Sequence, residues 1–588
     1  MRYILAHLKP RRGLLALVMT LKLSATLLEL LIPYVMEHLI DHAVPAGLLG
    51  TVLLWGAVML FLAFLVRTLN VMANRRAVRV ARDAIYDIRL ELFHAGLNLS
   101  GAQMDGVGLP SLISRMTTDT YNVQSFIQSI QTIGVRAPIM LLGGILVTLI
   151  MDRGLALILC VMAPVMIALV VTISRRGIPL YDRVQRGMDD IVRIMRENIT
   201  GIRVVKALSK EPYETERFAR VNDETARRDI RAGVTMALPG PIVTLFLNVG
   251  LTLVILIGAR RVNAGQTAPG VILAFLTYFN MILMGVMGLN RVFMMLSKAN
   301  ASASRIALVT EMPDDLPRAK DAPECPREGY IVFDHVSFNY PGAETAAGPD
   351  GAKERFAGSV RQRCLTDIDF TVRRGGSLGI IGATGSGKTT IVNLLMRFYD
   401  PDEGRVYVDG RDVRAWDRDD LRRRFGAVFQ NDAIFADTIR ENVVFGRDMT
   451  EEMLENALSD AMAAGFVDRY PEGVDHEAAI HGGNFSGGQR QRLLIARALG
   501  VMPDILVLDD ASSALDYRTD AQLRRNLAAR HADATLVVIA QRVSSIMGMD
   551  EILVLDEGRI IGRGTHEALL DGCPAYREIY ETQMGEVG

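Results

Sequence analysis

A chain of 588 residues is too long for one hydrophobic core, so the sequence predicts at least two domains. Half of the residues are hydrophobic and the mean hydropathy is +0.22, which is high for a soluble protein and favours membrane segments. The 65 basic and 66 acidic residues nearly cancel, so the overall charge gives no support for a nucleic-acid partner.

Six apolar stretches follow in the first half, each long enough to cross a hydrocarbon core of roughly 30 Å. The predicted membrane helices are Gly13–Ile40, Thr51–Val71, Ile130–Met151, Leu155–Ile173, Ala237–Gly258 and Gly270–Leu296. Basic residues precede the first stretch, which runs on too far to be the apolar core of a cleaved signal peptide. We expect an all-α six-helix transmembrane domain that begins with a cytoplasmic elbow.

Connections of alternating length join these stretches. Three are short, whereas about sixty residues separate the second stretch from the third, and a similar length separates the fourth from the fifth. Both long connections are rich in arginine, which prefers the cytoplasmic side of helix ends. The arginines are Arg75, Arg76, Arg79, Arg82 and Arg89 in one and Arg175, Arg176, Arg183 and Arg186 in the other. We expect both termini and both long connections on the cytoplasmic side of the cell membrane.

The long connections are themselves predicted to be helical, because few Gly or Pro interrupt Ala77–Asn98 or Val184–Ile199. At about 1.5 Å per residue, such helices extend tens of ångströms beyond the bilayer. Their turning points are predicted at Val107–Asp119 and Gly201–Phe218. A short helix at each would offer a docking surface for the second half of the chain.

Several polar side chains interrupt the apolar stretches. They are Lys22, Glu29, Arg67, Asn70, Arg136, Asn248 and Asn280. Charged groups at membrane depth commonly face a bundle interior or a watery cavity, which is the functional interpretation. The alternative is that they snorkel to the interface or pair from helix to helix. Both interpretations stay open for Glu29 and Arg67, whereas pairing is favoured for the asparagines.

The apolar periodicity ends after Leu308, and a linker bearing proline and charge follows at Glu311–Glu328. We expect a transmembrane domain over 1–310, a linker over 311–329 and a second domain over 330–588. The alternation in Ile331–Tyr340 predicts an edge strand with one irregular step. Pro341–Arg363 is rich in Gly and Ala and predicts an exposed loop.

The four cysteines indicate neither a disulfide framework nor a zinc site. Cys160, Cys325, Cys364 and Cys573 lie far apart, without a C-x-x-C pair. We interpret them as small hydrophobic residues or incidental thiols in a reducing cytosol.

A glycine-rich loop lies between the apolar run Leu378–Ile381 and the helical run Ile391–Phe398. This order of strand, loop and helix is the context of a phosphate-binding P-loop, whose glycines let backbone N–H groups close around phosphates. The residues expected at the nucleotide are Gly382, Thr384, Gly385, Ser386, Gly387, Lys388, Thr389 and Thr390. Lys388 is expected to reach the β- and γ-phosphates and Thr389 to bind Mg²⁺.

Further buried strands complete this domain. Ile505–Leu508 ends in Asp509 and Asp510, and a carboxylate delivered beside a P-loop is how such folds hold Mg²⁺. Leu536–Ala540 ends in Gln541, and Ile552–Ile561 predicts a terminal hairpin. Strands that alternate with helices give an α/β nucleotide-binding domain with a mainly parallel sheet.

The run from Asn484 to Arg492, with Ser486, Gly487, Gly488 and Gln489 at its centre, resembles the signature motif of ABC transporters. A serine and two glycines at a helix start form a second phosphate-binding nest. The resemblance covers essentially the whole chain and points to an exporter of the type IV fold. It implies a dimer in which each ATP lies between one P-loop and the opposite signature motif.

The resemblance also implies roles for single residues. Tyr340 is similar to the aromatic residue that stacks on adenine, and Gln430 to the glutamine that senses Mg²⁺ and contacts the membrane domain. Asp516 is similar to the aspartate of the loop that crosses the dimer. The two turning segments look like coupling helices. The implied cofactors are ATP and Mg²⁺, with Thr389, Gln430 and Asp509 at the metal.

Two positions depart from the family pattern. The general base is Glu in the family and is Asp510 here, and the switch residue is His in the family and is Gln541 here. Aspartate is roughly 1.5 Å shorter, a misplacement that can cost about a hundredfold in rate, and glutamine cannot carry a proton as histidine does. The pair resembles the degenerate half of heterodimeric bacterial multidrug exporters. Drift within a homodimer is the alternative.

The expected function is therefore one half of an ATP-driven exporter of amphipathic compounds or drugs. Its partner would be a homologous chain carrying Glu and His at the two departed positions. Slow turnover is expected at this chain's own P-loop, while its signature motif completes the partner's site. The alternatives are a homodimeric exporter of lipid or peptide, and a regulatory or gating subunit that binds ATP. The six apolar spans disfavour a soluble ABC ATPase.

Overall fold

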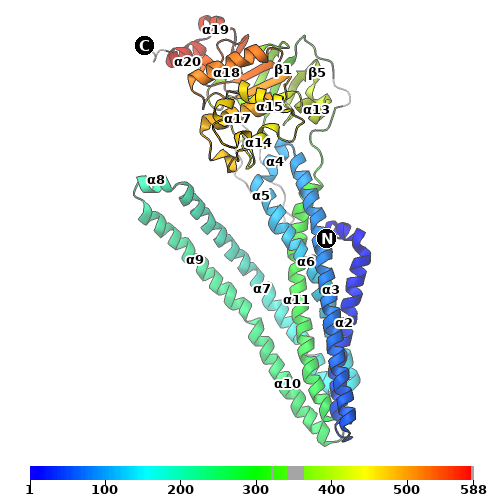
Figure 1. Ribbon diagram of the computed structural model, residues 1–588. Coiled ribbons are helices and arrows are strands. Elements are labelled where there is room, and N and C mark those ends of the chain that lie inside the picture. The colour runs from blue at the N-terminus through cyan, green and yellow to red at the C-terminus, as the bar shows by residue number, and fades with distance from the viewer. Residues whose placement is uncertain (320–322, 341–362, 585–588) are drawn as a thin grey trace. The chain divides into compact units, whose positions relative to one another are not determined.

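The computed structural model describes residues 1–319, 323–340 and 363–584, so nearly all of the loop predicted at Pro341–Arg363 lies outside the described residues. The chain divides into two compact units (Figure 1). Unit 1 comprises Met1–Leu97 and Pro110–Met312, and unit 2 comprises Asn98–Leu109 and Pro313–Gly588.

Unit 1 is helical throughout its regular structure. Its elements are α1 (Arg2–Leu8), η1 (Lys9–Arg11), α2 (Arg12–His38), η2 (Leu39–Ala43), α3 (Leu49–Asn98), α5 (Leu109–Ser114), η3 (Arg115–Asp119), α6 (Thr120–Met151), α7 (Arg153–Thr200), α8 (Ile202–Ala207), α9 (Glu211–Ala237), α10 (Pro239–Asn263) and α11 (Pro269–Thr310). Six helical spans among the described residues are long and apolar enough to cross a membrane. This confirms the six-helix prediction and the long extensions, since α3 has 50 residues and α7 has 48.

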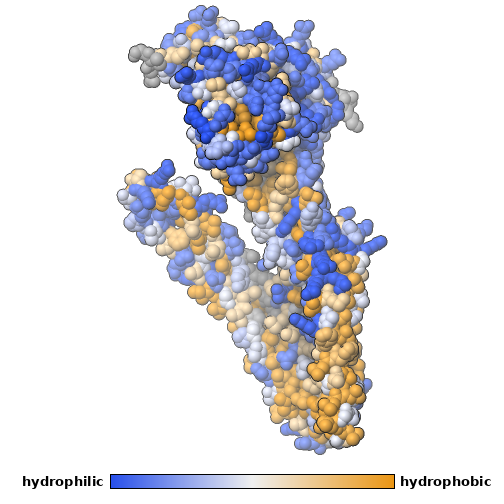
Figure 2. Space-filling view, viewed as in Figure 1, coloured by the Kyte–Doolittle hydropathy of each residue, from blue (hydrophilic) through white to orange (hydrophobic). Residues whose placement is uncertain are grey.

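The outer surface of these helices is suited to lipid. On α3, Leu60 is 75% and Phe64 is 71% exposed, a cost in water that a hydrocarbon environment removes. Figure 2 shows hydrophobic side chains over much of the surface of unit 1, and mostly hydrophilic ones over unit 2. The bilayer thus covers the apolar surface that the helices of unit 1 expose.

Small residues bring α6 and α11 together. A Cβ atom on Gly285 would lie 2.8 Å from the Ala137 carbonyl oxygen, and one on Gly288 would lie 2.9 Å from the Ala137 Cβ. Without a hydrophobic driving force in lipid, such close backbone approach is what packs membrane helices. The two helices are accordingly the most closely associated pair in this unit (Figure 1).

Most of the polar side chains at membrane depth are paired. Lys22 Nζ donates to Asn70 Oδ1 at 2.6 Å, and Arg136 Nη2 donates to Glu29 Oε1 at 2.7 Å. Asn280 Nδ2 donates to the Leu276 carbonyl within its own helix. Pairing from helix to helix therefore accounts for Lys22 and Asn70, whereas the Asn280 bond lies within one helix and Arg136 also lines a cavity.

Unit 2 holds two sheets. Their strands are β1 (Ile331–Asn339), β2 (Arg363–Val372), β3 (Ser377–Gly382), β4 (Glu403–Val408), β5 (Arg411–Asp412), β6 (Phe425–Val428), β7 (Ile505–Asp509), β8 (Thr535–Ile539), β9 (Glu551–Asp556) and β10 (Arg559–Gly564). The larger sheet has the order β10-β9-β3-β8-β7-β6 and is parallel except for the hairpin β9–β10. This confirms the α/β prediction and the terminal hairpin.

The smaller sheet corrects one prediction. Its order is β2-β1-β4-β5, so β1 lies between two strands and is not an edge strand. The error arises because β4 has an exposed, polar first half and offers little periodicity to recognise. The irregular step predicted in β1 is present as a register shift between Phe333 and Val336.

Helices accompany the two sheets in the part of unit 2 that follows Pro313 (Figure 1). They are α12 (Lys388–Leu395), η4 (Val413–Ala415), α13 (Arg418–Arg422), α14 (Ile439–Val444), α15 (Glu451–Asp460), α16 (Ala464–Val467), η5 (Gly473–Asp475), η6 (Ile480–Gly482), α17 (Gly487–Leu499), α18 (Tyr517–Arg530), η7 (Val543–Ser545), α19 (His566–Gly572) and α20 (Pro574–Met584). The strands β3, β7 and β8 are buried on both faces, as near-continuous apolar runs in a parallel sheet are.

The first turning point is also corrected. It is α4 (Gly101–Val107), which precedes most of the predicted segment Val107–Asp119 and packs within unit 2. The predicted segment instead forms α5 and η3, which lead back into α6. The second turning point, α8, falls inside the predicted Gly201–Phe218.

Candidate nucleotide-binding site

The P-loop connects β3 to α12 at the carboxyl edge of the larger sheet. Gly385 and Gly387 have φ values of 85° and 96°, a left-handed conformation that favours glycine. At Gly387 a Cβ atom would also lie 2.6 Å from Leu365 Cδ2. The loop can therefore keep this path only with glycine, and its backbone N–H groups gather at the start of α12.

Lys388 turns back over this loop. Its Nζ donates to the carbonyl oxygens of Gly382 at 2.9 Å and Ala383 at 2.7 Å. Burial lowers the pKa of the Lys388 amine, and the carboxylates of Asp509 and Asp510 oppose that shift. The ammonium group is thus held at the mouth of the loop, where a phosphate would be its natural counter-ion.

Thr389 and Asp509 bring two side-chain oxygen atoms together at the carboxyl edge of the larger sheet. Thr389 Oγ1 donates to Asp509 Oδ2 at 2.8 Å, across the gap between α12 and the end of β7. Burial raises the pKa of the Asp509 carboxyl because it disfavours the charged form, and a bound cation would remove that penalty. These hard oxygen donors fit Mg²⁺, which is held by few protein ligands together with phosphates. Gln430 follows β6, and Val428 of that strand pairs with Leu508 of β7. Because β6 and β7 are parallel, Gln430 lies at the same edge of the sheet as Asp509.

The two residues that depart from the family pattern touch each other. Gln541 Nε2 donates to Asp510 Oδ2 at 2.9 Å. Asp510 has a φ of 55°, which is uncommon for a residue with a side chain, and its N–H donates to the Ile539 carbonyl at 2.9 Å. Burial raises the pKa of the Asp510 carboxyl. Its carboxylate is therefore held toward Gln541 by a neutral donor.

The Ser486–Gln489 motif begins α17. Ser486 Oγ accepts from the Gln489 N–H, and Gln489 Oε1 accepts from the Ser486 N–H at 2.8 Å, which is a capping box. Among the described residues, no hydrogen bond joins this motif to the P-loop. Asp516 caps α18 in a similar way, accepting from the Thr519 N–H at 2.9 Å. The N–H groups of Gly487 and Gly488 donate no hydrogen bond among the described residues, and free N–H groups at a helix start can bind an anion.

Tyr340 lies in an aromatic cluster beside the P-loop helix. Its ring is edge-on to Tyr399, with centroids 5.1 Å apart, and to Phe338, with centroids 5.0 Å apart. Its hydroxyl contacts Thr390 Oγ1 at 3.2 Å and accepts from Asn393 Nδ2 at 3.0 Å. Tyr340 is thereby anchored to the helix that follows the phosphate loop.

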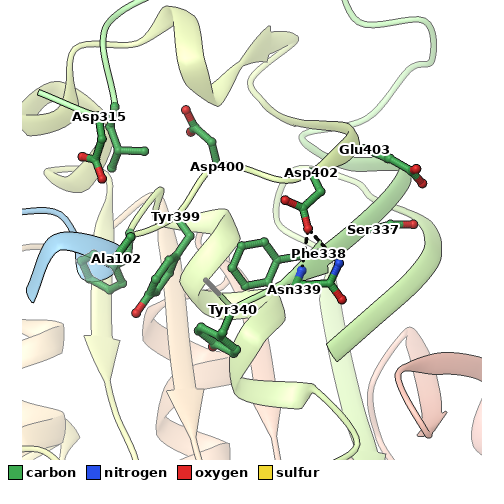
Figure 3. A pocket seen from close by; sticks show the side chains of 12 residues that line it. Ala102, Asp315, Ser337, Phe338, Asn339, Tyr340, Tyr399, Asp400, Asp402 and Glu403 are labelled. Atoms are coloured by element: carbon green, nitrogen blue, oxygen red, sulfur yellow. Dashed lines mark hydrogen bonds between the residues drawn. The ribbon is translucent and has the colours of Figure 1, made fainter. Parts of the chain in front are cut away.

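A cavity of about 410 Å³ opens beside this cluster (Figure 3). Four carboxylates line it, from Asp315, Asp400, Asp402 and Glu403. Asp402 accepts from the N–H and the side-chain amide of Asn339, which fixes the end of β1 just before Tyr340. The acidic wall of this cavity disfavours the binding of phosphate there.

Sequence reasoning missed the contact between α4 and this cluster. Tyr399 Oη donates to Asp105 Oδ2 at 2.6 Å, and the Gly101 N–H donates to the Phe398 carbonyl at 3.2 Å. Burial raises the pKa of the Tyr399 phenol, so it remains a donor. A local signal was present, because Ser100 and Gln103 form a capping box that marks the start of α4.

Replacing Tyr399 with phenylalanine is expected to remove the hydrogen bond that joins the aromatic cluster to α4, while it keeps the ring that contacts Tyr340. A hydrogen bond to a charged group contributes about 1.5–3 kcal/mol. We expect ATP affinity to change less than twofold and substrate-stimulated ATPase to fall several-fold. The measurement compares both quantities in purified Tyr399→Phe protein, with Tyr407→Phe as the matched control in β4. Equal losses in the two variants would contradict this role.

Comparisons with known proteins agree with this geometry. The ABC transporter transmembrane region family matches residues 15–287, and the ABC transporter family matches residues 365–513. The chain is 36% identical over 584 residues to an uncharacterized ABC transporter ATP-binding protein of Mycobacterium tuberculosis (strain CDC 1551 / Oshkosh), covering 98% of this chain and 97% of that protein. It is 32% identical over 531 residues to an ATP-dependent lipid A-core flippase of Methylobacillus flagellatus, covering 90% and 87%. A solved bacterial Atm1-family ABC exporter with ATP bound has a TM-score of 0.79 and 25% identity, covering 98% of both chains.

Proposed function

Because the chain belongs to the ABC transporter family, we propose that it is one half of a dimeric exporter that moves amphipathic compounds across the membrane. It is a multi-pass membrane protein with a cytoplasmic ATPase unit. The observation that supports the proposal best is the position of the signature motif. Ser486 and its glycines begin a 13-residue helix in the same unit as the P-loop, without a hydrogen bond to it among the described residues. A second chain would complete each site.

The proposed ATP site uses the groups already described. Lys388 would neutralise the β- and γ-phosphates, and Thr389, Asp509 and Gln430 would hold Mg²⁺. The metal would spread the charge that develops on the transferred phosphoryl group. Tyr340 would stack on adenine. Asp516 would lie at the dimer interface, and Thr384, Ser386 and Thr390 would line the phosphate loop.

We propose further that the partner is a homologous chain and that this chain's own site turns over slowly. The support is the contact between Asp510 and Gln541, which places a short carboxylate against a neutral amide. The neutral amide of Gln541 cannot accept the proton that a general base takes up and must pass on. The intact Ser486–Gln489 motif would serve the partner's ATP. ATP binding would then drive a rigid-body switch of the membrane helices, with α4 and α8 as the docking elements.

The exposed apolar surface of α8 supports a dimer. Val204 is 62% and Leu208 is 63% exposed on this six-residue helix and the residue that follows it. Exposed apolar side chains on a cytoplasmic helix favour a partner surface.

The test begins with the native complex. Co-purification of a homologous chain with Glu and His at the two positions supports the heterodimer, whereas a complex of this chain alone supports a homodimeric exporter of lipid or peptide. Substrate-stimulated, ATP-dependent uptake into inside-out vesicles supports transport. A second candidate, a gating subunit, is permitted by the same Asp510–Gln541 contact, and ATP-gated current without uptake would support it instead.

Removing the Lys388 amine is expected to weaken ATP binding at this chain's site by at least tenfold, because the P-loop loses its charge. Transport by the complex is expected to fall less, since the partner's site supplies the faster turnover. Nucleotide binding and vesicle uptake are measured on the Lys388→Ala complex, with exposed Lys298→Ala as the control. Abolition of both binding and uptake to the same extent would contradict the division of labour.

A further inference from the structure

A cavity of about 610 Å³ lies between α6, α10 and α11 in unit 1. Its size is that of a binding site for a small molecule. The lining residues are mostly apolar, with methionine the commonest type; the four methionines are Met140, Met284, Met287 and Met294. Methionine is flexible and polarizable, so a wall of this kind adapts to apolar bodies of different shape.

The cavity lies in the cytoplasmic half of the membrane. Arg136 is roughly 20 Å along α6 from Met151, at the outer end of that helix, and Arg291 is roughly 30 Å along α11 from Pro269. The hydrocarbon core is roughly 30 Å thick. The arginines therefore mark the cytoplasmic end of the cavity, and Met140 and Met284 lie toward the membrane centre.

The charge of the lining is positive. Arg136 and Arg291 both line the cavity, and none of the residues that line it is acidic. Arg291 is exposed and has no hydrogen-bond or ion-pair partner among the residues that the structure describes. The two arginines lie at facing positions of α6 and α11. Ala137, which follows Arg136, packs on Gly288, and Gly288 is one turn before Arg291.

Arg136 is incompletely satisfied. Its Nη2 donates to Glu29 Oε1 at 2.7 Å, but its Nε is buried without a hydrogen-bond partner. Glu29 Oε2 is buried and unpartnered as well. A buried polar group without a partner costs free energy, and the cost is larger for charged groups. An acceptor with better geometry could therefore replace Glu29 as the hydrogen-bond partner of Arg136.

We infer that this cavity binds an anionic amphiphile, whose acid group lies between Arg136 and Arg291 and whose apolar body lies along the methionines. Glu29 is the built-in counter-ion of Arg136 and competes with the acid group of the ligand. A cationic amphiphile finds no carboxylate among the lining residues and meets the uncompensated charge of Arg291. This inference rests on the proposed exporter function and names the charge class of its substrate.

The test uses the purified full-length complex in phosphatidylcholine nanodiscs, with empty nanodiscs as the partition blank. Radiolabelled dodecyl phosphate is the anionic probe, dodecyltrimethylammonium is the cationic probe with the same chain, and inorganic phosphate distinguishes an amphiphile site from a simple anion site. Equilibrium binding and ATP affinity are measured for Arg291→Gln, Glu29→Gln and Arg260→Gln. The last is the matched control, an exposed arginine on α10 outside the cavity.

Dodecyl phosphate is expected to bind at least tenfold tighter than the cation, and inorganic phosphate is expected not to compete with it. Arg291→Gln is expected to weaken dodecyl phosphate binding about tenfold, and Glu29→Gln to strengthen it several-fold because Arg136 is released. Arg260→Gln is expected to leave it unchanged. Equal affinity for the cation, effective competition by inorganic phosphate, or tighter binding in Arg291→Gln would overturn the inference. If dodecyl phosphate fails to bind while ATP affinity and uptake persist, the inference falls and the exporter function stands.

Discussion

The double substitution Asp510→Glu with Gln541→His is expected to raise ATP turnover at this chain's own P-loop by up to about a hundredfold. The glutamate would extend the carboxylate by roughly 1.5 Å, a distance at which misplacement can cost about that factor. The histidine would replace the amide that now donates to Asp510 Oδ2 and could carry a proton. Turnover is measured in single-turnover experiments on a complex whose partner P-loop has been inactivated.

Asp556→Glu provides a matched control for this experiment. Asp556 ends β9 as Asp509 ends β7, but it is exposed and outside the proposed site. Its substitution is expected to leave turnover unchanged. ATP affinity should stay within a few-fold of the native value in all variants, because the P-loop contacts are untouched. A double variant whose turnover equals that of the native chain would refute the slow-site account.

Gly487→Asp in the signature motif is expected to reduce hydrolysis at the partner's P-loop by at least a hundredfold. The new carboxylate would stand at the start of α17, where the partner's γ-phosphate is expected, and would oppose it by charge and volume. Within this chain the change is well tolerated. A Cβ atom on Gly487 makes only an ordinary contact of 3.7 Å with Ala514, and a negative charge favours a helix start.

The loss is therefore expected without loss of folding. Thermal stability and ATP binding at this chain's own P-loop should match the native values, which separates a damaged site from a damaged fold. Gly465→Asp is the control, because a Cβ atom at this position meets nothing within 4 Å. If the partner's site kept its turnover in Gly487→Asp, the two chains would not share their nucleotides in the way proposed.

Sequence patterns predicted the features that depend on neighbouring residues. The P-loop is recognisable because strand, glycines and helix are contiguous, and the helix start at Ser486 is recognisable because the serine and its two glycines are contiguous. The six membrane spans follow from apolar length alone. These signals need no knowledge of which elements meet in space.

Features that depend on distant residues were beyond prediction. The inner position of β1 requires β4 as its neighbour, some seventy residues later in the chain. The contact of Tyr399 with Asp105 joins positions that are 294 residues apart. The pairing of Glu29 with Arg136 requires the packing of α2 against α6, which no local periodicity states.

The placement of α4 has a practical consequence for dissecting the molecule. The twelve residues Asn98–Leu109 belong to the ATPase unit although they lie in the first half of the chain. Gly101 among them is so close to Tyr399 that a Cβ atom there would lie 2.5 Å from the ring. An isolated ATPase fragment that starts at Pro313 would uncover that ring and leave Asp315 without the Ser100 hydroxyl. A faithful soluble fragment must carry residues 98–109 as a grafted segment, because the two units are interleaved in the chain.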